Sequence, residues 1–369
     1  MIAPASSRER CATAQLPEHI AALTGVRFLA AIWVALFHLR EEISNLAPPL
    51  AGLGSRFGNG HHAVPFFFIL SGFILSHSYF PRYRVAHHAH FIFLRFARLW
   101  PVHVVTLSIL VAYHLATYRA AADAPSPYAT LPAEIGMIRC WWDKNLIWNY
   151  PAWSIHAEWF AYIFIFPLAF FFFGAEKRAS RLAALTLLLI VGHSILPTPL
   201  LPGKTFDIVL LFLAGSSLYQ LRVQLTSPRW ALLAYAGLGL LAFANIRDHA
   251  GALLYLSFAL IIMGLSYEGL MARFVSGKAL VYGGTISYSL YMSHAIVQKF
   301  AAELAKRIPE TYPATRLAAG LLAIAGLVAA AAALYHWVEA PGNALLRKWA
   351  ARAFTRPSRP SALKPVDAT

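Results

Sequence analysis

Long apolar segments recur from one end of the chain to the other, and short polar stretches between them carry most of the charged residues. Each apolar segment has roughly 16 to 22 residues, the length of an α-helix that crosses a bilayer. Ten such segments are expected, at 23–39, 63–80, 99–118, 153–173, 182–198, 206–221, 230–246, 251–270, 281–299 and 317–338. The pattern therefore predicts an all-α membrane protein, a polytopic bundle of about ten transmembrane helices.

Composition and charge agree with this fold class. Hydrophobic residues make up 59% of the 369 residues and charged residues only 13%, which does not suit a soluble globular protein. The net charge of +15 comes from short basic clusters between apolar segments, so we expect contact with membrane lipids and no nucleic-acid binding. Twenty of the 31 Lys and Arg residues are cytoplasmic if the N-terminus is, and the positive-inside rule then puts both termini in the cytoplasm.

The segments also suggest a simple organisation. Residues 1–22 are expected to be a cytoplasmic N-terminal segment without a cleavable signal, because no apolar core precedes the first span. Residues 23–340 would form the transmembrane domain, and residues 341–369 a basic, solvated cytoplasmic tail. Cys11 and Cys140 fall on opposite sides of the membrane in this topology, which leaves no disulfide framework.

The first span carries two ionisable residues on one face. Arg27 and His38 are eleven residues apart, three helical turns plus about 20°, so they share a face at a separation of roughly 16 Å. The residues between them on that face are mostly small, namely Ala30, Ala31, Val34 and Ala35. This pattern predicts a groove beside the helix into which a ligand chain fits.

Arginines near the third span suggest an anion site. Arg95 and Arg98 share a helix face, and guanidinium groups in this arrangement suit bidentate capture of phosphates. The alternative is that they are positive-inside anchors that reach lipid head groups. Arg27, a turn inside an apolar helix, favours the anion site.

Three further ionisable residues are expected in the outer halves of the spans. His38 has the chemistry of a general base for a hydroxyl, or it is a packed, hydrogen-bonded residue. Glu158 either orients His38, binds an acceptor hydroxyl, or pairs with an arginine. His294 ends a polar stripe with Ser287 and Tyr291, which serves either interhelical hydrogen bonding or substrate contact.

Other polar positions are less specific. Ser71 and Gly72 interrupt an apolar run and would permit close helix approach or a break that lines a cavity. The long connection 119–152 contains Trp141, Trp142, Trp148 and Tyr150, which suit interfacial anchoring better than sugar stacking. The histidines at 61–62 and 87–90 fall on opposite sides of the membrane without carboxylate or Cys partners, so no functional metal is expected.

These motifs together resemble the acyltransferase-3 family of integral-membrane acyltransferases. The resemblance rests on their order and spacing along nearly the whole chain. The motifs are Arg27-x10-His38, VPFFFILSGF from Val64 to Phe73, Arg95-Phe-Ala-Arg98 followed by Pro101, WSIHAE from Trp153 to Glu158, ISYSLYMSH from Ile286 to His294, and VEAP from Val338 to Pro341. Members usually have a small residue where this chain has His156, and many carry an additional extracytoplasmic domain.

The resemblance implies a donor, a site and an activity. The donor would be acyl-CoA, usually acetyl-CoA, as a co-substrate with no permanently bound cofactor. His38 and Arg27 would be needed for activity, and Arg95 and Arg98 would help to hold the donor at the cytoplasmic face. The family typically modifies bacterial surface glycans and some small molecules, which implies a multi-pass protein of the bacterial inner membrane.

We therefore expect an O-acyltransferase that acts on a surface or exported glycan. CoA phosphates would lie near Arg27, Arg95 and Arg98, and His38 would be the base, with Glu158 orienting it or the acceptor. Ser71, Tyr288, Tyr291 and His294 are the expected substrate or oxyanion contacts. The alternatives are acylation of a small molecule or a lipid-linked saccharide precursor, and, from another class, a transporter or flippase. Transport predicts a repeat symmetry that the sequence lacks.

Overall fold

The structure is a computed structural model that describes residues 19–50, 58–117, 127–143, 148–195, 208–246 and 251–354, together with Pro17 and Gly52. All regular elements among these residues are helical. The α-helices are α1 (Ala21–Leu46), α3 (Ala63–Tyr79), α4 (His88–Thr117), α5 (Leu131–Ile135), α6 (Ala152–Phe160), α7 (Phe166–Phe173), α8 (Ala179–Ile195), α9 (Val209–Gln224), α10 (Leu233–Ile246), α11 (Ala252–Leu265), α12 (Leu270–Val275), α13 (Lys278–Thr285), α14 (Ser287–Arg307), α15 (Pro313–Leu334) and α16 (Ala340–Phe354).

Shorter helical turns join these helices. Two are π-helical, η6 (Ala161–Ile165) between α6 and α7, and η9 (Tyr335–Glu339) between α15 and α16. The 3₁₀ turns are η1 (Pro48–Leu50), η2 (Gly60–His62), η3 (Val85–His87), η4 (Pro127–Thr130), η5 (Arg139–Trp141) and η8 (Pro228–Leu232).

Five continuous helical stretches among the described residues are long and apolar enough to cross a membrane. They are Ala21–Leu46, Gly60–Tyr79, Val85–Ala116, Ala152–Phe173 and Pro313–Phe354, and α8 and α11 are shorter apolar helices. Every one of the ten expected apolar segments overlaps a helix, so the all-α fold class is confirmed. The number of crossings, ten, and the cytoplasmic side of both termini stay predictions.

One expectation about an individual segment is wrong, and another segment has more regular structure than its pattern indicated. The ninth segment, 281–299, is not one helix, because α13 ends at Thr285 and α14 begins at Ser287. A β-carbon at Gly284 would lie 1.8 Å from the Thr24 carbonyl oxygen, so this end of α13 sits directly on the α1 backbone. The expected solvated tail is helical as far as Phe354, because apolar residues of α16 pack on α4. The Trp349 and Phe93 ring centroids are 4.9 Å apart.

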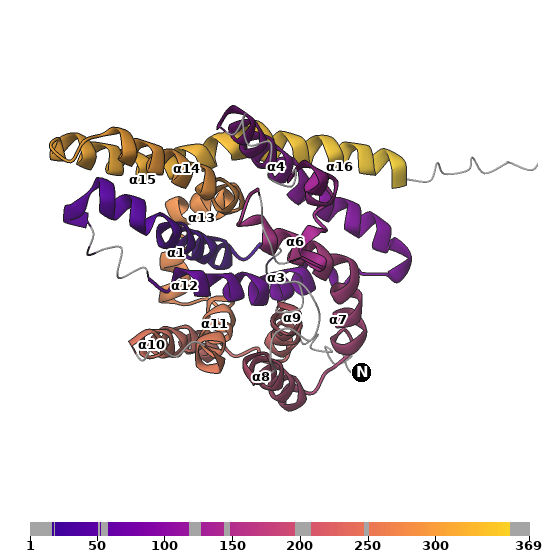
Figure 1. Cartoon of the computed structure of the whole chain (residues 1–369). Helices are drawn as coiled ribbons and strands as arrows, with labels where there is room; N and C mark the ends of the chain where they lie inside the picture. Colours follow the sequence, from indigo (N-terminus) through magenta and orange to yellow (C-terminus); the bar gives the residue numbers. More distant parts are fainter. Residues whose placement is uncertain are drawn as a thin grey trace, which may run out of the picture.

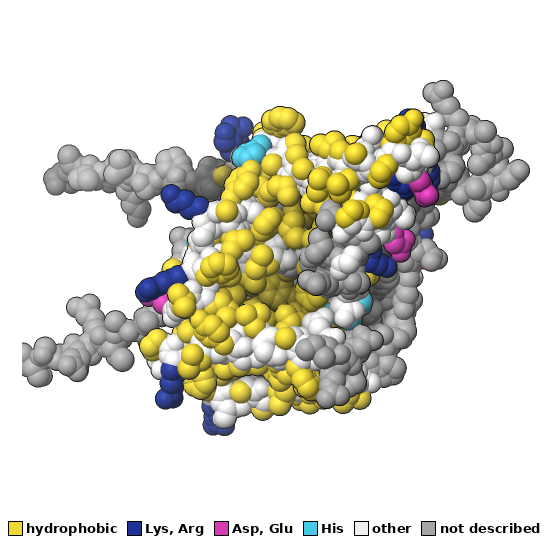
Figure 2. All heavy atoms as spheres, turned by 90° about the vertical axis from the view of Figure 1, so that its left-hand side faces the viewer, with side chains coloured by type: hydrophobic (Ala, Val, Ile, Leu, Met, Phe, Trp, Pro, Cys, Tyr) yellow, Lys and Arg dark blue, Asp and Glu magenta, His cyan; other side chains and the backbone are white. Residues whose placement is uncertain are grey.

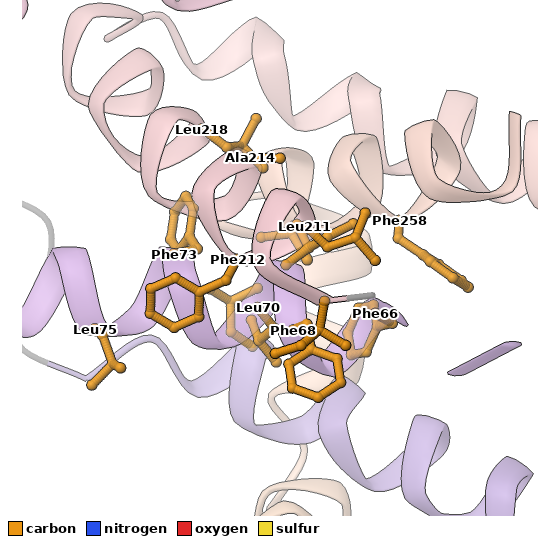
Figure 3. Close-up of a cluster of buried hydrophobic side chains, with 14 of the residues drawn as sticks. Phe66, Phe68, Leu70, Phe73, Leu75, Leu211, Phe212, Ala214, Leu218 and Phe258 are labelled. Atoms are coloured by element: carbon orange, nitrogen blue, oxygen red, sulfur yellow. The ribbon is translucent and has the colours of Figure 1, made fainter. Parts of the chain in front are cut away.

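The helices form two groups around a central pair. Figure 1 shows α8 to α11 on one side and α4, α14, α15 and α16 on the other, with α1 and α3 between them. The main hydrophobic core lies where α3 meets α9, and Figure 3 shows the phenylalanine and leucine side chains of the two helices interleaved there. This arrangement holds α1 and α3 in place against both groups.

The α3 and α9 backbones touch at glycines. A β-carbon at Gly72 would lie 2.0 Å from the Phe212 carbonyl oxygen, and one at Gly215 would lie 1.9 Å from the Ile69 carbonyl oxygen. No side chain fits between helices this close. Close helix approach is therefore the role of Gly72, as the sequence suggested.

One side of the molecule is largely apolar. Figure 2 shows mostly hydrophobic side chains across this face, with a hollow near its middle and most of the Lys, Arg, Asp and Glu side chains near its margins. A face of this kind suits contact with lipid tails rather than water. The protein is accordingly a multi-pass membrane protein.

Candidate active site

A cavity of about 170 Å³ lies among α1, α3, α4, α6 and α14. These helices are far apart in the sequence, yet each one contributes at least one polar side chain to the wall. The polar and charged residues that line the cavity are Arg27, Ser71, Arg95, Arg98, Ser154, Glu158, Tyr162, Ser287, Tyr288 and Tyr291. Apolar side chains, among them Phe67 and Phe68, complete the wall. The structure thus brings most of the candidate residues together.

The three arginines make the cavity strongly basic. Arg27 forms no hydrogen bond or ion pair with another residue of the described ranges. Arg95 donates from one terminal nitrogen to the Tyr79 hydroxyl at 2.9 Å, while its Nε is buried without a hydrogen-bond partner. These unused donors face a partly enclosed space, which suits a bound anion such as a phosphate.

Arg98 differs from the other two arginines because its partner is a carboxylate. Its guanidinium forms an ion pair with Glu339, at the end of the π-helical turn η9. Glu339 is almost completely buried, and its other carboxylate oxygen accepts a hydrogen bond from Ser289 at 2.6 Å. The VEAP motif therefore supplies the counter-charge of Arg98, a role that its sequence alone did not indicate.

Glu158 lies in the arginine cavity and not beside His38. Its Oε1 accepts hydrogen bonds from Ser71, at 2.9 Å, and from Tyr162. No ion pair with an arginine within 4 Å is seen among the described residues. The structure gives no contact between Glu158 and His38 among the described residues, so a role of Glu158 in orienting His38 stays a prediction without a direct contact to support it.

Two expected oxyanion donors have other partners. The Tyr288 hydroxyl donates to the Leu99 carbonyl oxygen at 2.6 Å, and the Ser71 hydroxyl donates to Glu158. A hydroxyl group has a single proton to donate. Both side chains line the cavity, but they stabilise an oxyanion only if these hydrogen bonds first break.

His38 belongs to a second cluster at the far end of the same α1 face. We call it the His38 cluster; its members are His38, Glu42, Tyr150, His294 and Gln298. The His38 ring stacks on His294 with ring centroids 5.2 Å apart, and the Tyr150 ring is 4.8 Å from His38. The structure thus brings His38 and His294 together, as their expected depths suggested.

Tyr291 connects this cluster to the cavity. It lines the cavity wall, its ring lies 5.5 Å from that of His294, and its hydroxyl accepts a hydrogen bond from Ser154 at 2.9 Å. His38 itself is not part of the cavity wall. Tyr291 thus contacts both sites, whereas the small α1 residues between Arg27 and His38 are buried in the helix packing and do not line the cavity, so the expected groove beside them is not seen in the described structure.

The aromatic residues of the long connection point inward more than expected. Trp148 is buried and donates to Thr130 at 3.1 Å, and Trp141 donates to the His156 carbonyl oxygen at 2.9 Å. Trp142 is half exposed, and Tyr150 joins the His38 cluster. Residues 119–126 and 144–147 of this connection lie outside the described ranges. These contacts hold the start of α6 in place; they are made within the protein and not with an interfacial belt of lipid head groups.

His156 also lies in a buried polar group, beside that connection. Its Nε2 is 3.6 Å from a carboxylate oxygen of Glu134, and the His103 Nε2 donates to the Glu134 backbone oxygen at 2.7 Å. Burial raises the pKa of the Glu134 carboxyl to about 7. Within the described part of the chain, no set of three or more His, Cys, Asp or Glu side chains is arranged to hold a metal ion.

Three residues that the sequence did not single out belong to these sites, namely Tyr162, Glu42 and Gln298. Tyr162 lines the arginine cavity from the π-helical turn η6. Glu42 and Gln298 follow His38 and His294 by one helical turn, so they share those faces. The four-residue spacing was the one signal in the sequence that could have identified the last two.

Comparison with known proteins gives a consistent result. A family model described as an acyltransferase domain matches residues 20–336. Protein 2 in the picA locus of Rhizobium radiobacter is 33% identical over 104 residues, which cover 28% of this chain and 49% of that protein. Acyltransferase MdmB of Streptomyces mycarofaciens is 29% identical over 156 residues, 40% of this chain and 38% of that protein. No solved structure matches.

Proposed function

Because the chain belongs to the acyltransferase-3 family, whose domain model covers most of its length, we propose that it transfers an acyl group, usually acetyl, from acyl-CoA to a hydroxyl of a surface or exported glycan. The observation that carries this proposal is the basic cavity that shares the α1 helix with His38. The curated relatives are matched over less than half of their length, so the donor and the acceptor are part of the proposal.

The donor would bind with its phosphates on the arginines. Arg27 and the buried Nε of Arg95 are hydrogen-bond donors without partners in the described structure, and phosphate oxygens are strong acceptors. Arg98 adds positive charge beside them. The pantetheine arm would extend from the cavity past Tyr291, so that the thioester comes to His38.

His38 would act as the general base. Its imidazole takes the proton of the acceptor hydroxyl while the hydroxyl oxygen attacks the thioester carbonyl carbon. The carbon–sulfur bond then breaks, and the CoA thiolate leaves and takes up the proton from His38. The products are an ester and CoA, and no oxidant or metal is consumed.

Acetyl-CoA turnover by the purified protein in nanodiscs tests this proposal. His38→Ala is expected to lower turnover about 10²- to 10⁴-fold, the usual contribution of a general base, while acetyl-CoA still binds. Arg27→Gln is expected to raise the KM for acetyl-CoA about tenfold, because charged hydrogen bonds to a phosphate are lost. Within the described ranges the Arg27 side chain forms no hydrogen bond or ion pair, but it is attracted electrostatically to Glu158, so the thermal stability of the variant is measured beside its KM.

A double change of two exposed arginines on α16, Arg347→Gln and Arg352→Gln, is the matched control for charge and should behave as the wild type. If His38→Ala and Arg27→Gln behave like this control, the site is wrong. Solute flux without any thioester turnover would favour a transporter instead.

A further inference from the structure

The His38 cluster is built from two helix faces that meet in register. On α1, His38 and Glu42 are four residues apart, and on α14, His294 and Gln298 have the same spacing, so each pair shares a face. The His38 ring stacks on the His294 ring, and Glu42 is hydrogen-bonded to Gln298. Tyr150 closes the cluster from the connection before α6.

The Gln298 side chain forms hydrogen bonds with three other members of this cluster. Its Nε2 donates to the His38 carbonyl oxygen at 2.9 Å and to the Glu42 Oε1 at 3.0 Å. Its Oε1 accepts from the Tyr150 hydroxyl at 2.9 Å, and burial raises the pKa of Tyr150, so the phenol keeps its proton. Both N–H donors of the amide are thus in use, and its oxygen accepts one hydrogen bond.

Glu42 is left with one unused oxygen. Its Oε1 is bound by Gln298, whereas its Oε2 is buried and has no hydrogen-bond partner among the residues that the structure describes. A buried carboxylate oxygen without a donor is unfavourable, because the hydration that it loses is not replaced. Since Glu42 lies one turn beyond His38, this free acceptor is about 6 Å along the α1 axis from the proposed base.

His294 has a second unused acceptor. Its Nδ1 is 2.6 Å from the Tyr291 carbonyl oxygen, which can only accept, so Nδ1 carries the proton and Nε2 of the neutral ring is an acceptor. The His294 side chain is completely buried, and its Nε2 has no hydrogen-bond partner among the described residues. The planes of the His38 and His294 rings are only 24° apart, so the in-plane lone pair of Nε2 passes alongside the His38 ring and not into it.

Two hydrogen-bond acceptors without a partner among the described residues, Glu42 Oε2 and His294 Nε2, therefore lie beside His38, the residue that would activate the hydroxyl of the acyl acceptor. We infer that Glu42 Oε2 and His294 Nε2 form a subsite for a polyhydroxylated acceptor, a sugar or another polyol, of which one hydroxyl faces His38 and further hydroxyls donate to these two atoms. This inference rests on the proposed function and assigns the residues that would bind its glycan acceptor. A substrate with a single hydroxyl would leave these buried hydrogen-bond acceptors unpaired. Sites of this kind discriminate most strongly against substrates that lack the matching group.

Glu42→Gln tests the subsite without changing its shape. The new amide keeps the oxygen that Gln298 binds, but it puts a donor where the free carboxylate oxygen was. The matched control is Glu41→Gln, since the Glu41 side chain is 78% exposed and pairs only with Arg40, at 3.5 Å. The assay is the formation of labelled ester from radiolabelled acetyl-CoA by nanodisc protein, with methyl glucoside, glycerol and propan-1-ol as the acceptor probes.

The wild type is expected to use methyl glucoside and glycerol at least tenfold better than propan-1-ol, compared as kcat/KM. Glu42→Gln should raise the KM for both polyols about tenfold while the KM for acetyl-CoA stays at the wild-type value, and Glu41→Gln should match the wild type. A higher KM for the polyols with an unchanged KM for acetyl-CoA is a result that a general loss of folding would not produce.

Three results would overturn the inference. The first is equal use of propan-1-ol and the polyols, and the second is a Glu42→Gln variant that matches Glu41→Gln. The third is a wild type that hydrolyses acetyl-CoA but acylates neither polyol; this outcome removes the subsite and leaves the donor half of the proposed function intact. Failure of the proposed function itself is distinguishable, because acetyl-CoA would then not be consumed at all.

Discussion

The ion pair between Arg98 and Glu339 shows how one residue can tie the cavity to a distant part of the chain. Arg98 lies on α4, whereas Glu339 comes 241 positions later, at the end of η9. The Glu339 side chain is 1% exposed and that of Arg98 is 25% exposed. Removing one partner of such a pair leaves a charge that neither water nor protein satisfies.

Glu339→Gln is expected to lower the free energy of unfolding by about 3 kcal/mol, because the Arg98 cation loses its counter-charge. The double variant Arg98→Met with Glu339→Gln should recover part of this loss, since it removes both charges. Thermal unfolding in detergent measures both. Glu303→Gln, in an exposed pair with Lys306, is the control and should cost less than 1 kcal/mol. Equal effects of Glu339→Gln and this control would contradict the argument.

At the same scale, the sequence predicted which residues are functional candidates better than it predicted their partners. Position along an apolar segment gives approximate depth, and this was enough to group Arg27 with Arg95 and Arg98. It was not enough for Glu158, because side-chain partners depend on which faces of different helices meet. No pattern within α6 indicates that Ser71 of α3 would be the neighbour.

At the scale of elements, periodicity predicted the helices but not their irregularities. The π-helical turns Ala161–Ile165 and Tyr335–Glu339 interrupt long helices; the first brings Tyr162 to the cavity wall, and the second brings Glu339 to Arg98. A π-turn adds one residue to a turn and so rotates the faces beyond it. Apolar composition is the same on both sides of such a turn, which is why the sequence does not reveal it.

The contact between α3 and α9 gives a prediction at this scale. Gly72→Ala puts a methyl group 2.0 Å from the Phe212 carbonyl oxygen, so the helices have to separate. We expect a loss of about 2 to 3 kcal/mol in the free energy of unfolding. Gly239→Ala on α10 is the matched control, because nothing lies within 4 Å of its new β-carbon. It should be neutral or stabilise by about 0.5 to 1 kcal/mol. A Gly72→Ala protein as stable as the control would show that the two backbones are farther apart.

At the scale of the whole molecule, hydrophobicity sets the environment and charge sets the orientation. The largely apolar face in Figure 2 suits lipid, and the basic residues are concentrated in the segments that the ten-span topology puts in the cytoplasm. The apolar helices α8 and α11 are shorter than the five stretches that are long enough to cross a membrane. The number of crossings therefore has to be measured.

Cysteine labelling measures this orientation. In a protein with Cys11 and Cys140 replaced by Ala, exposed Thr311→Cys lies between α14 and α15, and exposed Lys348→Cys lies on α16. An impermeant maleimide should label Thr311→Cys on intact cells, and Lys348→Cys only after the membrane is opened, because α15 crosses between them. Labelling of both positions from the same side would contradict the ten-span topology.

The single helix α1 carries both Arg27 and His38 without a break. Two groups on one rigid rod keep a fixed distance, here about 16 Å, whatever the surrounding helices do. If a donor must contact both Arg27 and His38, it has to be long enough to span this distance. Acetyl phosphate, in which the phosphate and the acetyl group are directly joined, is too short to span it, so this protein should discriminate between activated acetyl donors by their length.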